Sequence, residues 1–147
     1  MKTILTEKNL DYLNVLRKKK KIVLCHGVFD ILHYGHITHF NMAKKFGEIL
    51  VVSITEDAFV NKGPDRPIFP SLIRAKTILN LEIVDFVIIS KSPNAISVLK
   101  KIKPNFYVKD KEYQSKDSIF FKNFILEKNF LKKLIVELNL LIKLNTV

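Results

Sequence analysis

The chain has 147 residues, of which 48% are hydrophobic, and its 25 lysines and arginines against 14 aspartates and glutamates give a formal net charge of +11. The length fits one domain, residues 1–147, and the apolar content excludes a disordered chain. No apolar run reaches the ~20 residues of a membrane-spanning helix. The single cysteine, Cys25, excludes an internal disulfide and a cysteine-cluster metal site. No secretory signal is visible, which favours a cytoplasmic protein without membrane partners.

The excess of positive charge suits a partner that carries phosphate, such as a nucleotide, a sugar phosphate, a nucleic acid or an anionic membrane. Most of the charge comes from lysine, and the run at 17–21 is typical of the solvated C-terminal end of a helix. Charge alone therefore supports a phosphate ligand without identifying it.

The hydrophobic pattern alternates between short apolar runs and helical periodicity. Thr6 and Ser71 are placed to cap helices, and Gly47 is placed to end one. In chain order the pattern predicts a helix from Thr6 to the basic run, a strand at 22–25, a helix at 35–46, a strand at 49–54, a short helical piece at 57–60, a helix at 71–81, a strand at 86–89, a helix at 93–102 and a strand at 106–108. This alternation indicates an α/β, Rossmann-like parallel sheet with helices on both faces.

The pattern changes from about residue 117 onward. Phe120, Phe121, Phe124 and Ile125 have helical spacing, and a second amphipathic stretch runs from 131 to 144. We therefore expect a helical C-terminal tail, with residues 130–147 as its atypical part. Its apolar face must be buried against the sheet, against a second copy of the chain or against another protein.

The segment 25–36, Cys-His-Gly-Val-Phe-Asp-Ile-Leu-His-Tyr-Gly-His, lies between the first predicted strand and its helix. Open parallel sheets bind ligands at such loops, and a helix N-terminus offers N–H groups to a phosphate. His33 and His36 are three residues apart, so both rings can face one point above the first helical turn. Gly35 removes a side chain where the backbone must approach a phosphate closely.

This segment resembles the signature of the cytidylyltransferase-like nucleotidyltransferases, a Gly-x-Phe-Asp turn followed by His-x-Gly-His. The similarity extends over about 21–115 and includes Thr-Glu-Asp at 55–57, Lys-Gly-Pro-Asp-Arg-Pro at 62–67, Arg-Ala at 74–75, Val-Asp at 84–85 and Val-Lys-Asp-Lys-Glu-Tyr at 108–113. Within the family, these stretches are most similar to the heptose-phosphate adenylyltransferase and glycerol-3-phosphate cytidylyltransferase group.

The resemblance implies attack of a sugar- or polyol-phosphate oxygen on the α-phosphate of CTP or ATP, with release of pyrophosphate. It implies His33, His36 and Lys62 as catalytic residues, with Mg²⁺ entering with the triphosphate and no metal bound by the chain itself. The nucleotide-binding residues that it implies are Gly27, Val28, Phe29, Asp30, His33, Gly35, His36, Lys62, Lys109 and Asp110. The relatives act in synthesis of cell-surface polysaccharide precursors and commonly form homodimers, which we expect here too.

Several residues keep alternative interpretations. Arg74 and Asp85 are candidates either for acceptor or subunit contacts or for structural ion pairs. Asp30 fits a loop-fixing acceptor for nearby N–H groups better than a base. His26 is interpreted as a turn histidine bonded to backbone, with contact to the ligand as the alternative, and His39 as a residue on the flank of a helix without a role.

The sequence departs from the family pattern at three places. Ile73 stands where relatives carry an acidic residue, and Asp110 stands where they carry a glycine. The Ser/Thr-rich motif that opens the last helix of the relatives has no counterpart, since Thr146 is the one hydroxyl-bearing Ser or Thr after Ser118. A catalytically impaired nucleotide-binding relative is therefore the alternative to an active enzyme. A nucleic-acid-binding domain is disfavoured, because no recognition motif accompanies the charge.

Overall fold

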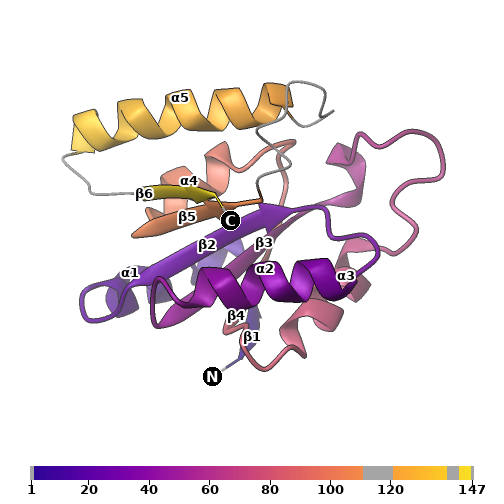
Figure 1. The fold of residues 1–147 in the computed structure, drawn as a ribbon, viewed down its shortest axis with the longest axis horizontal. Coiled ribbons are helices and arrows are strands. Elements are labelled where there is room, and N and C mark those ends of the chain that lie inside the picture. Colours follow the sequence, from indigo (N-terminus) through magenta and orange to yellow (C-terminus); the bar gives the residue numbers. More distant parts are fainter. Residues whose placement is uncertain (1, 111–120, 139–142, 147) are drawn as a thin grey trace.

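The computed structural model describes residues 2–110, 121–138 and 143–146, and Figure 1 shows them as one sheet with helices on its two faces. Within these residues the sheet has six strands, in the order β1-β4-β3-β2-β5-β6. They are β1 (Thr3–Leu5), β2 (Ile22–Gly27), β3 (Ile49–Thr55), β4 (Phe86–Ser90), β5 (Phe106–Lys109) and β6 (Lys143–Thr146). Each neighbouring pair is parallel, which confirms the predicted Rossmann-like α/β class.

The helices that connect the strands are α1 (Asp11–Arg17), α2 (Tyr34–Lys44), α3 (Ser71–Leu79), α4 (Ile96–Ile102) and α5 (Phe121–Leu138), with short 3₁₀ turns at Glu7–Asn9 and Asp57–Phe59. The chain proceeds from β2 through β3 to β4 in one direction and then returns to place β5 on the other side of β2. The carboxyl edge between β2 and β5 is thus the point where the strand order reverses, and open α/β sheets bind ligands there.

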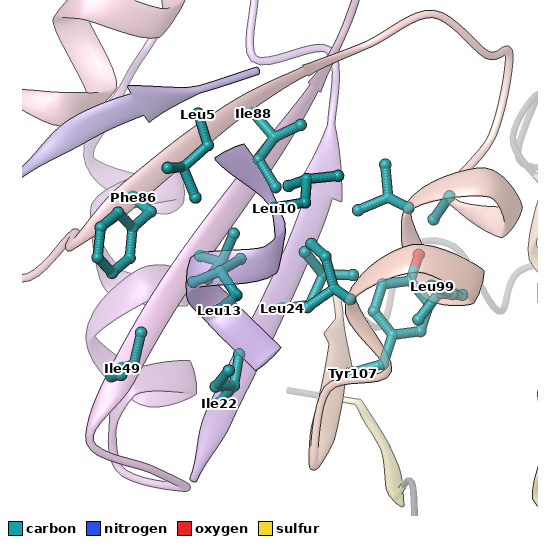
Figure 2. Close-up of a cluster of buried hydrophobic side chains, with 14 of the residues drawn as sticks. Leu5, Leu10, Leu13, Ile22, Leu24, Ile49, Phe86, Ile88, Leu99 and Tyr107 are labelled. Atoms are coloured by element: carbon teal, nitrogen blue, oxygen red, sulfur yellow. The ribbon is translucent and has the colours of Figure 1, made fainter. Parts of the chain in front are cut away.

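Side chains alternate between the two faces along the central strands. Ile22, Leu24, Ile49 and Val51 join a core cluster with α1, α4 and α5, and Figure 2 shows part of it around Leu13, Leu99 and Tyr107. Val23, Cys25, Leu50 and Val52 face the other way, toward Phe40 and Ala43 of α2 and Ala75 and Ile78 of α3. Both faces of β2 and β3 are buried, which is why these strands are continuous apolar runs in the sequence.

The predicted strands at 22–25, 49–54, 86–89 and 106–108 are all present, extended by one or two residues. β1 is not among the predicted strands, because three residues are too few to show a periodicity; its backbone pairs Thr3 with Phe86 at the edge of the sheet. Ser71 is not a helix cap. It is the first residue of α3, and Pro70 precedes it without a side-chain cap.

The predicted helical tail is confirmed as far as Leu138, and Leu131 is buried in the core beside α4. The tail does not end as a helix, because Lys143–Thr146 forms β6, with Lys143 paired to Phe106 and Thr146 to Lys109. Lys143, Leu144 and Asn145 alternate in polarity, so the segment can extend the sheet once β5 offers an edge. Residues 111–120 and 139–142, which include Phe120, Leu141 and Ile142, lie outside the described residues.

Candidate functional site

An open cleft of about 320 Å³ lies at the carboxyl edge where the strand order reverses. It brings together the loop after β2, the first turns of α2, the loop after β3 and the residue that follows β5. Its lining is His26, Val28, Phe29, Asp30, Ile31, His33, Gly35, His36, His39, Lys62, Arg66 and Asp110. Most of the residues assigned from the family pattern thus meet in one place.

The two histidines of the motif cap α2 reciprocally. His33 is the N-cap residue, and its Nδ1 accepts a hydrogen bond from the Gly35 N–H at 3.1 Å. The His33 N–H donates in turn to Nδ1 of His36 at 3.3 Å. Because each Nδ1 accepts from a backbone N–H, the proton of each neutral ring sits on Nε2. Both imidazoles therefore keep an Nε2–H donor for a ligand.

The two rings stack, with their centroids 3.8 Å apart and an interplanar angle of 27°. Burial lowers the pKa of His36 to about 4, and the neighbouring His33 and Lys62 contribute to this fall, against the opposing effect of Asp110. His36 is therefore a neutral donor at pH 7. A neutral donor can hold an anionic oxygen without exchanging a proton with it, as an oxyanion-binding group requires.

Local backbone features hold the motif in this shape. Phe29 has a positive φ of 48°, rare for an aromatic residue, and its ring packs edge-on against His36 and Phe40. A Cβ on Gly35 would come within 2.8 Å of the His33 ring, and one on Gly27 within 2.9 Å of the Phe29 ring. Gly35 thus makes room for His33 itself, which is a different reason from the close phosphate approach that we expected.

Asp30 fixes the loop that follows β3. Its carboxylate accepts hydrogen bonds from the N–H groups of Ile68 and Phe69, at 2.8 and 3.0 Å, and forms an ion pair with Arg66 at 3.1 Å. These bonds hold the pKa of Asp30 below its usual value despite the opposing effect of burial. The interpretation of Asp30 as an acceptor for loop N–H groups is confirmed, although the donors belong to a more distant loop.

Lys62, on the loop after β3, and Asp110, directly after β5, both line the cleft, as the family pattern implies. The effect of both on the pKa of His36 shows that their charges lie near its ring. Gly27 and Lys109 differ from the other predicted nucleotide-binding residues, because they line a neighbouring cavity and not the cleft.

This second cavity, of about 360 Å³, adjoins the cleft and shares His26 and Val28 with it. It is walled by the ends of β2, β3 and β5, the loop after β4 and the first turns of α5. Its other lining residues are Gly27, Thr55, Phe59, Asn61, Pro93, Asn94, Lys109, Lys122, Asn123, Leu126 and Glu127. Lys109 therefore lies on the second cavity, where it forms a buried ion pair with Glu127 at 3.2 Å.

Glu127 was not among the residues predicted from the sequence, although a signal exists. It lies on α5 three residues after Phe124 and four before Leu131, both of which are buried. A carboxylate on the apolar face of an amphipathic helix must find a buried partner. The sequence alone does not identify that partner, because Glu127 lies beyond the segment at about 21–115 in which motifs of the family are visible.

Two further histidines reach the site. His26 is part of β2, not of a turn, and its ring bonds side chains rather than backbone: Nδ1 lies 2.9 Å from Ser53 Oγ and Nε2 lies 3.5 Å from Thr55 Oγ1. Burial and the nearby Lys109 lower its pKa to about 4. His39 is buried on α2 and lines the cleft, and its Nδ1 has no hydrogen-bond partner among the described residues. His39 is thus a buried residue of the cleft wall and does not lie on an exposed flank of α2.

Arg74 and Asp85 have the structural roles that the sequence left open. Arg74 is 2% exposed, and its guanidinium donates to the carbonyl groups of Phe69, Val28 and Thr55 and to Asp57. It lines neither the cleft nor the second cavity.

Asp85 pairs with Lys44 and accepts from the Leu50 N–H. It directly precedes β4, at the amino edge of the sheet, so it lies at the edge opposite the cleft. Neither residue therefore fits acceptor binding in this subunit, since the guanidinium is saturated by protein acceptors and the carboxylate is remote.

Comparison with known proteins agrees with this geometry. The cytidylyltransferase-like family model matches residues 24–138. The bifunctional protein HldE of a Nitratiruptor species is 39% identical over 105 residues, which are 70% of this chain and 23% of that protein. HldE of Campylobacter fetus subsp. fetus is 40% identical over 108 residues, covering 72% and 24%. The chain thus spans about a quarter of the length of these curated relatives.

Among solved structures, the lipopolysaccharide core biosynthesis protein from Thermoplasma volcanium GSS1 is similar with a TM-score of 0.68 and 27% identity, over 87% of this chain and 96% of that one. Pantoate-beta-alanine ligase from Francisella tularensis, at a TM-score of 0.60 and 16% identity over 100% and 67% of the two chains, shares the fold. The residues matched by the family model include both motif histidines, Lys62, Asp110 and the strands that position them. The chain belongs to the cytidylyltransferase-like family of nucleotidyltransferases.

Proposed function

We propose that this protein transfers a nucleotidyl group from CTP or ATP to a sugar- or polyol-phosphate and releases pyrophosphate. The observation that carries the proposal is the pair of imidazoles at the N-terminus of α2. Their Nδ1 atoms accept from backbone N–H groups, so each ring keeps Nε2 for a ligand, and both residues line the same cleft. Donors at a helix N-terminus are suited to the non-bridging oxygens of an α-phosphate.

In the proposed reaction, an oxygen of the acceptor phosphate attacks the α-phosphorus, and the bond from that phosphorus to the bridging oxygen of the β-phosphate breaks. The electron pair leaves with pyrophosphate. A phosphate monoester has its second pKa near 6, so its nucleophilic oxygen is already ionised at pH 7 and no general base is needed. A site of neutral donors and cations suffices, and catalysis rests on positioning and charge stabilisation.

Lys62 would follow the β- and γ-phosphates as they depart, and its place in the lining of the same cleft supports this role. The described residues hold no cluster of three side chains able to bind a metal ion. Asp110 lines the cleft, while Asp30 is taken up by loop N–H groups. A Mg²⁺ ion would therefore be held chiefly by the triphosphate oxygens, whose charge it would reduce.

The second cavity is our candidate for the acceptor, in place of Arg74 and Asp85. It shares His26 and Val28 with the cleft, so a phosphate bound there would border the α-phosphate position. The similarity to the Thermoplasma volcanium protein supports a role in synthesis of cell-surface polysaccharide precursors. No helix among the described residues is long and apolar enough to cross a membrane.

The test is pyrophosphate release from CTP and from ATP, with Mg²⁺, against a panel of heptose, glycerol and other polyol phosphates. We expect one nucleotide and one acceptor class to give turnover that His36→Ala reduces. A triphosphate that raises the melting temperature without any pyrophosphate release would instead support a nucleotide-binding relative. A ligand at 100 times its Kd stabilises by ~2.7 kcal/mol, which a melting experiment detects easily. A parent protein that neither binds a triphosphate nor releases pyrophosphate would overturn the proposal.

A further inference from the structure

The wall of the second cavity contains a buried ion pair that the proposed chemistry does not yet use. The side chains of Lys109 and Glu127 are 3% and 2% exposed, and Nζ lies 3.2 Å from Oε2. The Glu127 carboxylate also accepts from the Ala95 N–H at 2.8 Å and from the Tyr107 hydroxyl at 2.7 Å. Three donors, from β5 and the residue that precedes α4, thus converge on one carboxylate of α5.

A buried ion pair is a weak device for stability alone. Removing two charges from water costs several kcal/mol per ion, and a well-packed apolar pair often serves a core equally well. The surrounding core offers that alternative, because Phe124 and Leu131 on the same face of α5 are buried apolar side chains. The position of the pair is more informative, since both side chains line the cavity.

We propose that Glu127 is a positioning residue that holds the Lys109 ammonium at the wall of the second cavity, where Lys109 binds the phosphate of the acceptor. This inference rests on the proposed function and names the groups that recognise its second substrate. The bonds from the Ala95 N–H and the Tyr107 hydroxyl fix the Glu127 carboxylate, and the carboxylate fixes the Lys109 ammonium. The cation is then preorganised, and a phosphate need not order a flexible lysine on binding.

The rest of the cavity matches an anionic, hydroxylated ligand. Lys122, from the first turn of α5, is a second cation in the lining, and Asn61, Asn94 and Asn123 add amide groups. Asn123 also donates to the Pro93 carbonyl at 3.3 Å, which ties α5 to the loop after β4. His26 lies on the wall shared with the cleft, where burial lowers the pKa of its imidazole and the nearby positive charge of Lys109 lowers it further. A phosphate held by Lys109 would thus lie beside the triphosphate cleft.

The alternative is that the pair only docks α5 on the sheet. To separate the two, we would measure KM for the acceptor phosphate, KM for the triphosphate and kcat in the parent, Lys109→Met, Lys109→Arg and Glu127→Gln. We expect Lys109→Met to raise the acceptor KM about 10- to 100-fold, as for a lost charge-assisted hydrogen bond, with less than about a twofold change in triphosphate KM. Glu127→Gln should move the same constant, and Lys109→Arg should restore part of it.

Lys122→Gln and Lys128→Gln are a matched pair on α5, because Lys128 is exposed and does not line the cavity. We expect the acceptor KM to rise in the first variant only. Variants that melt at a lower temperature but keep both KM values would show a docking role and overturn the inference, as would equal shifts in both constants.

Failure of the proposed function gives a different result from failure of the inference on Lys109. If the parent releases no pyrophosphate, the inference is tested with inorganic phosphate alone, by calorimetric titration of the parent and of Lys109→Met. Weaker binding by the variant supports a phosphate site at Lys109. Equal affinity, or no binding to the parent, overturns it.

Discussion

The imidazoles of His33 and His36 perform two tasks with different atoms. Nδ1 completes the N-terminus of α2, and Nε2–H remains for a ligand. Replacing either ring therefore removes a helix cap together with a phosphate donor. Loss of a cap costs ~1 kcal/mol, whereas loss of a transition-state donor costs ~3 kcal/mol in activation free energy. Replacing either imidazole should therefore lower the reaction rate more than the stability of the fold.

We accordingly expect His36→Ala to lower kcat by ~10²- to 10³-fold with only a small fall in melting temperature. Tyr34→Phe is the control, because Tyr34 lies on the same turn, is 81% exposed and does not line the cleft. We would measure pyrophosphate release and the melting temperature for both variants and the parent. Equal turnover of His36→Ala and the parent would show that the motif is not catalytic here, and a parent without turnover moves the comparison to triphosphate affinity.

His26 predicts a pH dependence of stability. Its pKa is about 4 in the folded chain, against an ordinary value of 6.5, because burial and Lys109 disfavour the charged ring. Above pH 6.5 the ring is mostly neutral in the folded and the unfolded chain, so its contribution is nearly constant. Between pH 6.5 and 4 the unfolded chain binds a proton that the folded chain does not, so the free energy of unfolding falls as the pH falls.

The slope from this one group approaches ~1 kcal/mol per pH unit between about pH 6 and 4. Urea unfolding at about pH 7.5, 6 and 5 should show the fall, and His26→Gln should reduce its slope. Part of the slope should remain in the variant, because the pKa of His36 is also lowered to about 4. The depressed pKa values of Asp30 and Glu127 act in a lower window, since carboxylate stabilisation is lost only as the pH falls below the unfolded values near ~4. An identical slope in His26→Gln and the parent would contradict this assignment.

Among the elements, those whose signal is local could be predicted from the sequence. The buried strands β2 and β3 are unbroken apolar runs, and α2 begins at a motif whose side chains cap it. β1 and β6 are short edge strands, and they exist because β4 and β5 offer them a partner. Their strand conformation depends on pairing within the sheet, which a local sequence pattern does not show. The helical prediction for residues 143 and 144 was therefore wrong.

The candidate site divides in the same way. The motif histidines, Asp30, Lys62 and Asp110 were predicted from segments close to the family pattern, and they meet in the cleft. Arg74 and Asp85 lie in such segments too, yet their roles depend on which carbonyl or lysine the fold places beside them. Glu127 depends on a partner 18 positions earlier in the chain, and no local pattern could specify that pairing.

The loop between β3 and α3 is held to the loop after β2 through Asp30. Asp30→Asn would turn an NH₂ group toward one of the backbone donors of Ile68 and Phe69, leaving that donor unpaired. We expect a loss of ~1–3 kcal/mol in stability and faster proteolysis within residues 61–70. Limited proteolysis and urea unfolding test this, with Asp65→Asn as the control, because asparagine tolerates the positive φ of that position. Equal cleavage rates in the two variants would contradict the tether.

At the scale of the whole molecule, α5 and β6 close one side of the structure. Figure 1 shows α5 lying along β5 and β6 on the same face as α4. Phe124 and Leu131 bury its inner face, Glu127 ties it to β5, and β6 covers the edge that β5 would otherwise expose. The tail therefore completes the core of its own subunit, whereas the homodimer remains a prediction.

Truncation after Asn129 tests this assignment. It would remove Leu131 from the core and leave the edge of β5 unpaired, and unpaired strand edges are templates for aggregation. Loss of a buried leucine alone costs ~2–5 kcal/mol, a large share of the ~5–15 kcal/mol that a domain of this size has. We expect the truncated chain to melt at a markedly lower temperature or to aggregate, and Leu131→Ala to reproduce part of the loss while the exposed Lys132→Ala does not. Light scattering with size-exclusion chromatography, before melting, would show whether the parent is a dimer and whether stability falls without a change in oligomeric state. A truncated protein that stays soluble, keeps its oligomeric state and melts at the same temperature as the parent would show that residues 130–147 are dispensable. That result would contradict the closing role of α5 and β6.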